Sequence, residues 1–287
     1  MISLNSVIRA DILEVLPTFP TASAQSIIAD PPYFNVLQNV DWDTQWDKLT
    51  EYLEWCDIWT SHCIRILKDD GLFFIFGQLG KREHGFIHLM SRLCRRYQFH
   101  DLLIWDRVVG YNERRDSFTP AYEMVLVLRK SGQVKFRKDA VRVPYDTKTI
   151  EMYLRDKRYK DRESRMRHLS KGKYATNILS VPSLKGSSKE RCGHPSQKPV
   201  ELITKLVLSS TDPGDLVFDP FLGSGTTAVV AEMHGRKWAG IEINDAYCAI
   251  CEQRLQEVRG GLFTNAQEPS LETVALSEEA SLQHKEI

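Results

Sequence analysis

Two segments of the chain combine residue types and spacing that could do chemistry. The first is DPPYF, Asp30–Phe34, which directly follows the apolar run Ser26–Ala29. If that run is a strand of an open α/β sheet, the segment lies at its carboxyl end, where such sheets bind ligands. Two prolines leave carbonyls without neighbouring N–H donors, Asp30 adds a charged acceptor, and Tyr33 offers a flat ring. These groups suit a planar molecule bearing an amino group, such as adenine or cytosine, although Asp-Pro-Pro is also an ordinary rigid turn.

The second segment is FDPFLGSGTTA, residues 218–228, which follows the apolar run LVF and opens a helical pattern. Gly223 and Gly225 allow close backbone approach, and a helix N-terminus favours an anionic or polar ligand group. Glu242 lies 23 residues after Asp219, at the end of the next apolar run, where an acidic residue typically binds ribose hydroxyls. The third glycine of the dinucleotide motif and the lysine of a P-loop are both missing. The spacing therefore predicts a nucleoside-binding loop of another kind.

Short apolar runs alternate with longer amphipathic runs, which predicts strands alternating with helices. The predicted strands are Ser26–Ala29, Leu72–Phe76, Leu102–Trp105, Met124–Leu128, Leu216–Phe218 and Ala239–Ile243. The predicted helices are Gln45–Leu67, Glu83–Arg96, Lys198–Ser209, Thr226–His234 and Ala246–Val258. This alternation is typical of a mostly parallel α/β sheet with helices on both faces. No helical segment separates the third predicted strand from the fourth, so this pair could be antiparallel and the sheet mixed.

The charge of the chain is zero in total but unevenly distributed. Lys plus Arg and Asp plus Glu each number 38, which taken alone argues against a nucleic-acid partner. Residues 129–191, however, hold 19 basic and 7 acidic residues, a net charge of +12 that the rest of the chain balances. We therefore divide the chain into 1–130, a basic and helical or irregular insertion at 131–192, 193–259, and an acidic tail at 260–287 that we expect to be mobile.

Composition also bears on the compartment and on metal chemistry. No secretory leader is evident, and no apolar run approaches the ~20 residues that span a bilayer, so we expect no membrane association. Six cysteines in 287 residues are too few for a disulfide scaffold and indicate the reducing cytoplasm. Cys248 and Cys251 form a CxxC within a helical pattern, which we interpret as buried thiols and not as a metal site.

Four segments in a consistent order resemble the motifs of the S-adenosylmethionine-dependent amino-methyltransferases of DNA. They are DPPYF, HPSQKP (His194–Pro199), FDPFLGSGTT and GIEIN; RADILEVL and the Trp-rich VDWDTQWDKLTEYLEW also match. The resemblance covers about residues 3–259 apart from the basic block. Because DPPYF precedes the glycine loop and the block lies between them, the order is that of the permuted β group. The resemblance implies a Rossmann-like methyltransferase fold: a mixed, mostly parallel sheet with one antiparallel strand, helices on both faces and an inserted basic recognition region.

The resemblance also implies roles for individual residues. The catalytic motif consists of Asp30, Pro31, Pro32 and Tyr33. Within it, Asp30 and the Pro31 carbonyl would accept hydrogen bonds from the target amino group and orient its delocalised lone pair. Tyr33 would stack on a base flipped out of the duplex, with Phe34 either beside it or in the core. His194 is expected to be structural, and no metal is expected. The implied residues around S-adenosylmethionine are Asp11 near the adenine, Asp30, Lys198 near the carboxylate, Glu242 on the ribose, and Asp219, Phe221, Gly223, Ser224, Gly225 and Thr226 around the methionine part.

The basic block occupies the position of the family's target-recognition region, so double-stranded DNA is the expected partner. The stretch Leu154–Lys173 looks helical and could lie against phosphates through Arg155, Lys157, Arg158 and Lys160. The loop at residues 108–120, with Arg114 and Arg115, is a second DNA-contact candidate. The resemblance also allows a homodimer and a cognate restriction endonuclease.

The function expected from the sequence is site-specific methylation of the N6 amino group of adenine in DNA. The choice of base depends on Asp30, because cytosine-N4 enzymes of this family commonly have Ser in its place. Cytosine-N4 methylation stays open, as does methylation of RNA or of a protein amide. An NAD-dependent oxidoreductase could use the glycine loop but would leave DPPYF and HPSQKP unexplained. A DNA-binding protein without activity would not need an intact DPPY motif.

Overall fold

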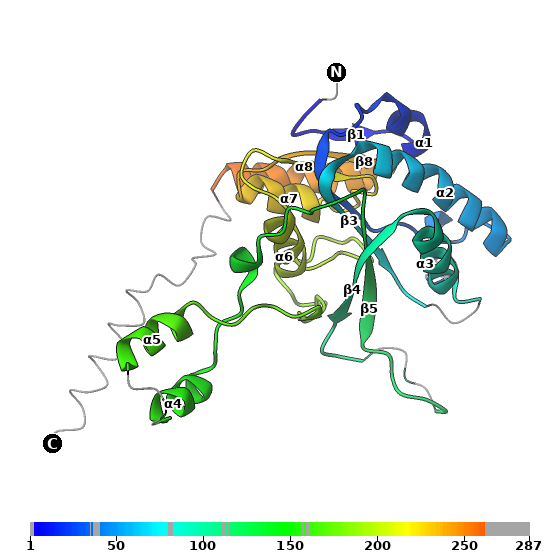
Figure 1. Ribbon diagram of the computed structural model, residues 1–287. Coiled ribbons are helices and arrows are strands. Elements are labelled where there is room, and N and C mark those ends of the chain that lie inside the picture. The colour runs from blue at the N-terminus through cyan, green and yellow to red at the C-terminus, as the bar shows by residue number, and fades with distance from the viewer. Residues whose placement is uncertain are drawn as a thin grey trace.

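The computed structural model describes residues 3–34, 36, 41–79, 83–110, 113, 115–156, 158 and 161–261. Within these residues eight strands form one sheet in the order β1-β8-β7-β2-β3-β5-β4-β6 (Figure 1). β5 is antiparallel to both of its neighbours, and every other neighbouring pair is parallel. The predicted mixed sheet with one antiparallel strand is therefore confirmed. The strands are β1 (Val7–Arg9), β2 (Ala24–Ala29), β3 (Leu67–Gly77), β4 (Gln98–Asp106), β5 (Tyr122–Arg129), β6 (Ile178–Ser180), β7 (Leu216–Asp219) and β8 (Lys237–Glu242).

Helices cover both faces of the sheet, and a separate hydrophobic core lies under each layer. On β3 the side chains alternate between the two cores, with Phe73 and Ile75 on one face and Phe74 and Phe76 on the other. One layer holds α1 (Ile12–Val15), α2 (Leu49–Ile66) and α3 (Gly85–Arg96), and the other holds α6 (Val200–Ser210), α7 (Thr226–Met233) and α8 (Asp245–Arg259). Short 3-10 helices lie at η1 (Leu16–Thr18), η2 (Asp41–Asp43) and η3 (Lys138–Val141). The predicted strands and helices are thus confirmed, with ends shifted by a few residues.

The parallel strands bring the two chemical segments to one edge of the sheet. Asp30 follows the last residue of β2, while Asp219 and Glu242 are the last residues of β7 and β8. Because β2, β7 and β8 are consecutive neighbours in the sheet, these carboxyl groups lie along the same edge. β5 runs in the opposite direction and begins at this edge, which places Glu123, its second residue, there as well.

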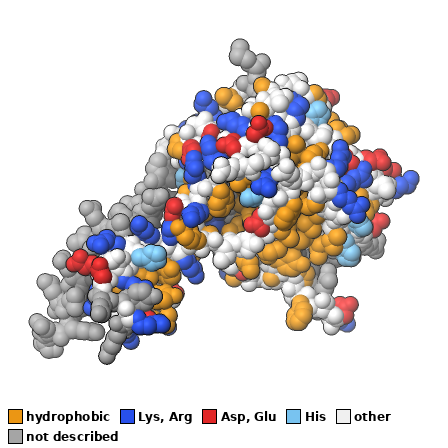
Figure 2. All heavy atoms as spheres, viewed as in Figure 1, with side chains coloured by type: hydrophobic (Ala, Val, Ile, Leu, Met, Phe, Trp, Pro, Cys, Tyr) orange, Lys and Arg blue, Asp and Glu red, His pale blue; other side chains and the backbone are white. Residues whose placement is uncertain are grey.

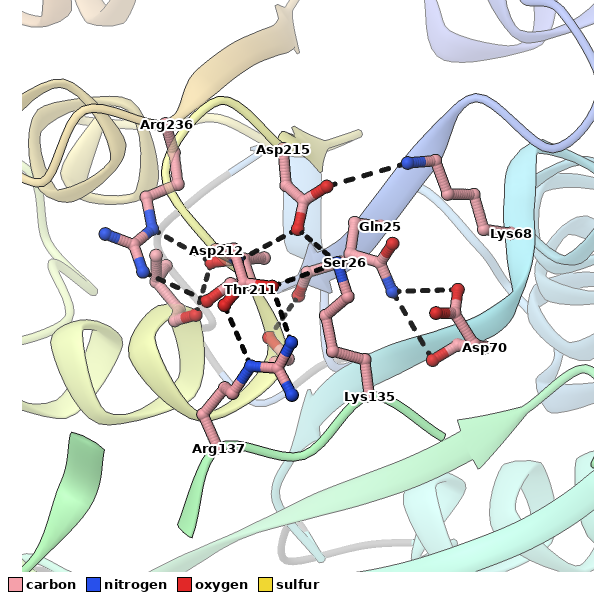
Figure 3. Close-up of polar contacts among 12 residues, drawn as sticks. Gln25, Ser26, Lys68, Asp70, Lys135, Arg137, Thr211, Asp212, Asp215 and Arg236 are labelled. Atoms are coloured by element: carbon pink, nitrogen blue, oxygen red, sulfur yellow. Dashed lines mark hydrogen bonds and ion pairs between the residues drawn. The ribbon is translucent and has the colours of Figure 1, made fainter. Parts of the chain in front are cut away.

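At the opposite edge, ion pairs attach the chain that leaves β5 to the body (Figure 3). The Lys135 ammonium lies 2.8 Å from a carboxylate oxygen of Asp215, and Arg137 donates to both carboxylate oxygens of Asp212 at 2.8 and 2.6 Å. The backbone N–H of Arg137 also donates to the Ser209 carbonyl at the end of α6. The start of the basic block is therefore held against the sheet.

Beyond this attachment, α4 (Thr147–Arg155) and α5 (Arg162–Ser170) form an arm that stands away from the sheet, at the lower left of Figure 1. The stretch Leu154–Lys173, which looked helical from the sequence, is helical at Arg162–Ser170 but is not one continuous helix. α4 ends at Arg155, and Asp161 caps a new helix by accepting a hydrogen bond from the Ser164 N–H at 2.9 Å. The basic block also contributes β6, which pairs with β4 at the edge of the sheet.

Two further features concern expectations from composition. Cys248 and Cys251 are both buried on α8, as the helical pattern predicted. In the part of the chain that is described, no helix is long and apolar enough to cross a membrane. The predicted acidic tail lies outside the described residues apart from Gly260 and Gly261.

Candidate active site

A cavity of about 500 Å³ opens at the carboxyl edge of the sheet, a size typical of sites for small ligands and cofactors. Asp11 reaches it from the N-terminus of α1, where its carboxylate also caps the helix through the Leu13 N–H at 2.8 Å. Most of the residues that the sequence assigned to the cofactor line this cavity. They are Asp11, Asp30, Lys198, Asp219, Phe221, Gly223, Ser224, Thr226 and Glu242.

The glycine loop is fixed to β8 by the carboxylate of Glu242. This carboxylate accepts hydrogen bonds from the Gly223 N–H at 2.8 Å and from the Asn244 N–H at 2.7 Å. Burial raises the pKa of Glu242, although these donors favour its charged form. Gly223 has φ +52°, and a Cβ there would lie 3.2 Å from Nε2 of His194. The loop therefore passes close to His194, and Glu242 both fixes the loop and lines the cavity.

Gly225 lies in the same loop but is not among the residues that line the cavity. It forms the N-cap of α7 with φ +78°, and a Cβ there would come within 2.2 Å of the Cys251 sulfur on α8. Its expected place next to the methionine part of the cofactor stays a prediction. Packing between α7 and α8 explains why this position requires glycine.

Asp219 is a buried carboxyl group at the end of β7, with 5% of its surface exposed. One carboxylate oxygen accepts a hydrogen bond from the Phe221 N–H at 2.9 Å. Burial raises the pKa of Asp219 to about 7, and the nearby charges of Asp30 and Glu242 act in the same direction. Near neutral pH this group is therefore able to exist in either protonation state.

His194 lines the same cavity as a buried, neutral imidazole. Its ring stacks on Trp42 with centroids 6.4 Å apart and meets Tyr247 edge-on at 4.3 Å. Burial, followed by the positive charge of Lys198, lowers the pKa of His194 to about 4. An imidazole held neutral between two rings supports the expected structural role.

The Asp30 carboxylate is already engaged on both oxygens. Oδ2 lies 2.5 Å from Nζ of Lys198, and Oδ1 accepts a hydrogen bond from the Tyr33 hydroxyl. Burial raises the pKa of Tyr33 well above its ordinary value, so the hydroxyl keeps the proton that it donates. Lys198 was expected near the cofactor carboxylate; its side chain does line the large cavity, but its ammonium contacts Asp30.

The rest of the DPPYF loop is held by side chains from the segment that follows it. The Asp43 carboxylate accepts hydrogen bonds from the Tyr33 N–H at 2.5 Å and the Val36 N–H at 2.7 Å. The Tyr52 hydroxyl donates to the Pro32 carbonyl at 2.8 Å. Phe34 is buried in the core, with its ring centroid 5.4 Å from that of Tyr52. It is therefore a core residue and not part of the wall beside Tyr33.

A second, smaller cavity of about 150 Å³ adjoins the first. Asp30 and Lys198 line both cavities, as do Trp42, Ser196 and Gln197. Pro31 and Tyr33 line the smaller cavity, together with Glu123 and Arg107, two residues that the sequence analysis missed. The available signal was an acidic residue at the start of the apolar run YEMVLVLR, in the strand that runs opposite to the others.

Comparisons with known proteins agree with this arrangement. The family model described as DNA methylase matches residues 24–253. The chain belongs to the DNA methylase family. It is similar to the DNA adenine methyltransferase YhdJ of Escherichia coli (strain K12), with 31% identity over 252 residues that cover 88% of this chain and 82% of that protein.

Solved structures show the same fold at lower identity. The PvuII DNA methyltransferase (cytosine-N4-specific) matches with a TM-score of 0.65 and 21% identity, over 88% of this chain and 86% of that one. The M1.HpyAVI–SAM complex matches with a TM-score of 0.58 and 22% identity, over 87% and 98%. The Rossmann-like methyltransferase fold is thus confirmed for this DNA methylase.

The structure of this DNA methylase describes three of the six residues predicted to contact DNA. Arg114, Lys157 and Lys160 lie outside the described residues. Arg115 is exposed on the connection between β4 and β5 at the carboxyl edge of the sheet. The side chains of Arg155 and Arg158 on the arm are 82% and 84% exposed. In the described residues, no cluster of His, Cys, Asp or Glu side chains is arranged to bind a metal ion.

Proposed function

We propose that this DNA methylase transfers a methyl group from S-adenosylmethionine to the exocyclic N6 amino group of adenine in double-stranded DNA. The observation that carries the proposal is that Asp30 lines both of the adjoining cavities. A carboxylate in this position can hold an amino group in the smaller cavity while the larger cavity holds the methyl donor.

The residues of the larger cavity fit S-adenosylmethionine, which supplies an electrophilic methyl group on a sulfonium. The Glu242 carboxylate, at the end of β8 and in the cavity wall, would accept hydrogen bonds from ribose hydroxyls. Asp219 and the Gly223–Thr226 loop would surround the methionine part, since the ionised form of Asp219 attracts its cationic groups. The M1.HpyAVI structure, whose fold this chain shares, is described as a complex with SAM.

Asp30 would act on the amino group of the target. An aromatic amino group is a poor nucleophile because its lone pair is delocalised into the ring, and hydrogen bonds to two acceptors help to localise that pair. The Asp30 carboxylate supplies one acceptor. The Pro31 carbonyl supplies the other, since none of the hydrogen bonds among the described residues uses it. Orientation and electrostatic stabilisation would then provide most of the rate enhancement.

The smaller cavity requires that the target base leave the helix. A volume of about 150 Å³ bordered by the Tyr33 ring and the Trp105 side chain cannot admit a duplex, whereas an extruded base is flat and compact. Enzymes that act on a base commonly flip it out of the stack in this way. Double-stranded DNA bound with one base flipped is therefore the substrate that we propose.

Adenine is preferred over cytosine for two reasons. Asp30 occupies the position where cytosine-N4 enzymes of the family commonly have Ser, and the similar YhdJ protein is named as an adenine methyltransferase. Cytosine-N4 methylation is the second candidate, because the PvuII enzyme with the same fold is named as cytosine-N4-specific. Both bases carry an amino group next to a ring nitrogen, so the same loop could present either.

One experiment tests the reaction and the base together. The purified chain is incubated with S-adenosylmethionine and unmethylated genomic DNA, and the DNA is digested to nucleosides for mass analysis. We expect N6-methyladenine from the wild type and a rate at least ~100-fold lower from Asp30→Ala, with cofactor affinity changed only a few-fold. Asp47→Ala, at an exposed position, is the matched control. N4-methylcytosine would overturn the choice of base, and unmethylated DNA would overturn the function.

A further inference from the structure

The ammonium of Lys198 lies between two carboxylates. Its Nζ is 2.5 Å from Oδ2 of Asp30 and 3.6 Å from Oε2 of Glu123. Lys198 and Glu123 are buried, with side chains 7% and 5% exposed, while that of Asp30 is 20% exposed. Among the described residues these two carboxylates are the only ones that form ion pairs with Lys198.

Glu123 is held rigidly at its distance from Lys198. Its Oε1 accepts a hydrogen bond from Nη1 of Arg107 at 3.1 Å, and its Oε2 lies 3.2 Å from the Tyr33 hydroxyl, whose single proton is shared with Asp30. The Lys198 ammonium also lies over the rings of Phe76 and Tyr33, 5.1 and 5.4 Å from their centroids. The two rings and the second carboxylate surround the ammonium. It can therefore move from Asp30 towards Glu123 without becoming exposed to solvent.

The ion pair with Lys198 conflicts with the role of Asp30 in methyl transfer. The target amino group must donate its hydrogen bond to the carboxylate that the ammonium occupies. As the bond from sulfur to the methyl group breaks and the bond to nitrogen forms, the amino nitrogen becomes positively charged until it releases one proton to water. A second cation 2.5 Å from the same carboxylate oxygen opposes that charge. Movement of the ammonium away from Asp30 would therefore favour methyl transfer.

The geometry points to Glu123 as the group that receives the Lys198 ammonium when the target amino group takes its place on Asp30. In this inference, which rests on the proposed methyl transfer, Glu123 is a positioning residue that acts through Lys198. A shift of the ammonium by about 1 Å towards Glu123 would convert the longer contact into a normal ion pair. Arg107 and Tyr33 keep the receiving carboxylate in place during this shift.

The titration of Lys198 supports this arrangement and provides a test. Burial by itself would lower the pKa of Lys198, but the charges of Asp30 and Glu123 outweigh it, so the pKa is raised and the ammonium stays protonated. Removing the charge of Glu123 takes away one of the two groups that raise this pKa. The charged or titratable groups that face Lys198 are Asp30 and Tyr33 in the catalytic loop, Arg107 after β4, Glu123 in β5 and His194 before α6.

The test measures a single turnover of methyl transfer with saturating cofactor and DNA. In Glu123→Gln the ammonium has no second carboxylate and stays on Asp30, so we expect a rate at least ~10-fold below wild type at pH 7.5, with cofactor affinity within twofold. The deficit should shrink as the pH is raised, because loss of the Glu123 charge lowers the pKa of Lys198 relative to wild type and the neutral amine releases Asp30. Glu123→Asp keeps a carboxylate and should recover most of the rate.

A matched control separates positioning from folding. Glu232 lies on α7, 3.0 Å from Arg259, and accepts a hydrogen bond from the Trp238 indole at 2.7 Å, and it lines neither cavity. Glu232→Gln also removes an ion pair but should keep the wild-type rate. If Glu123→Gln is too unstable to assay, Glu123→Asp, whose shorter side chain lies farther from Lys198, should give an intermediate rate with wild-type cofactor affinity.

Two results would overturn the inference about Glu123. One is a wild-type rate for folded Glu123→Gln at every pH, and the other is a Glu123→Asp variant that is as slow as Glu123→Gln. A wild-type protein that methylates no DNA would instead refute the proposed function, and the inference with it. The wild-type reaction is therefore measured first.

Discussion

Asp219 makes the stability of this protein depend on pH near neutrality. Burial raises its pKa in the folded state to about 7, whereas an unfolded chain has a value near 3.8. Between these two pKa values the folded protein keeps the Asp219 carboxyl protonated, whereas the unfolded chain has released that proton. The free energy of unfolding therefore falls as the pH rises from 4 to 7. Above pH 7 the Asp219 carboxylate is ionised in the folded state, and the cost of burying its charge lowers the free energy of unfolding in full.

Asp219→Asn removes this cost, because the amide is neutral at every pH and keeps an oxygen for the Phe221 N–H. We expect the variant to be more stable than wild type at pH 8, by an amount on the order of 4 kcal/mol or less, with the difference gone near pH 4. Urea denaturation across this range measures it, with the exposed Asp47→Asn as control. A variant less stable than wild type at pH 8 would show that Asp219 is ionised at little cost in the fold.

The sequence predicts site residues well where position along a strand decides their place. Asp30, Asp219 and Glu242 follow apolar runs, so the sheet puts them on one edge. Lys198 and Glu123 were assigned differently or missed because their roles arise from contacts across 168 and 90 residues of chain. No local pattern encodes such a contact, since it depends on how distant strands are ordered in the sheet.

At the scale of elements, length and periodicity decide what the sequence reveals. β5 was recognised as a candidate antiparallel strand because no helix separates it from β4, and the pairing confirms this. β6 has only three residues and owes its conformation to β4, where the Trp105 indole donates to the Val181 carbonyl at 2.7 Å. A strand that depends on its neighbour in this way carries too short a pattern to detect.

The attachment of the basic block to the sheet should contribute measurably to stability. Asp215 accepts hydrogen bonds from Lys135 at 2.8 Å and from the Asp212 N–H at 2.9 Å, and Lys68 lies 3.6 Å away (Figure 3). Burial alone would raise the pKa of Asp215, but the hydrogen bond from Lys135 outweighs it and the pKa is lowered. The stabilisation is thus present above the ordinary carboxyl pKa and is lost as the pH falls through the lower, folded value.

We expect Asp215→Asn to lower the free energy of unfolding by about 1 kcal/mol at pH 7, because the amide cannot form the ion pairs. The difference from wild type should narrow as the pH falls below about 4, where the wild-type carboxylate is itself protonated. Denaturation at several pH values measures this. Glu51→Gln, which removes an exposed pair with Lys48 at 3.8 Å, should cost almost nothing. Equal losses in the two variants would mean that the network at Asp215 adds no stability.

At the scale of the whole molecule, the net charge of zero is the sum of an acidic part and a basic part. The sheet and its helices hold the cavities and the excess of acidic residues, whereas the arm of α4 and α5 projects from them (Figure 1). Figure 2 shows Lys and Arg side chains on the exposed surface of this arm, at the lower left. DNA binding depends on the positive charge at the contact surface and not on the net charge of the whole chain. An arm with exposed Lys and Arg side chains can therefore bind phosphates although the chain is neutral.

The double variant Arg155→Glu with Arg158→Glu should therefore weaken DNA binding. If each arginine neutralises one phosphate, the slope of log Kd against log salt concentration should fall by about 2, with cofactor affinity unchanged. Fluorescence anisotropy with duplex DNA between 50 and 300 mM salt measures the slope. Lys48→Glu with Lys237→Glu reverses two exposed charges on the body and makes the same change in net charge. An equal loss in both double variants would indicate a general charge effect, and an unchanged slope in the first would exclude these arginines from the phosphate contacts.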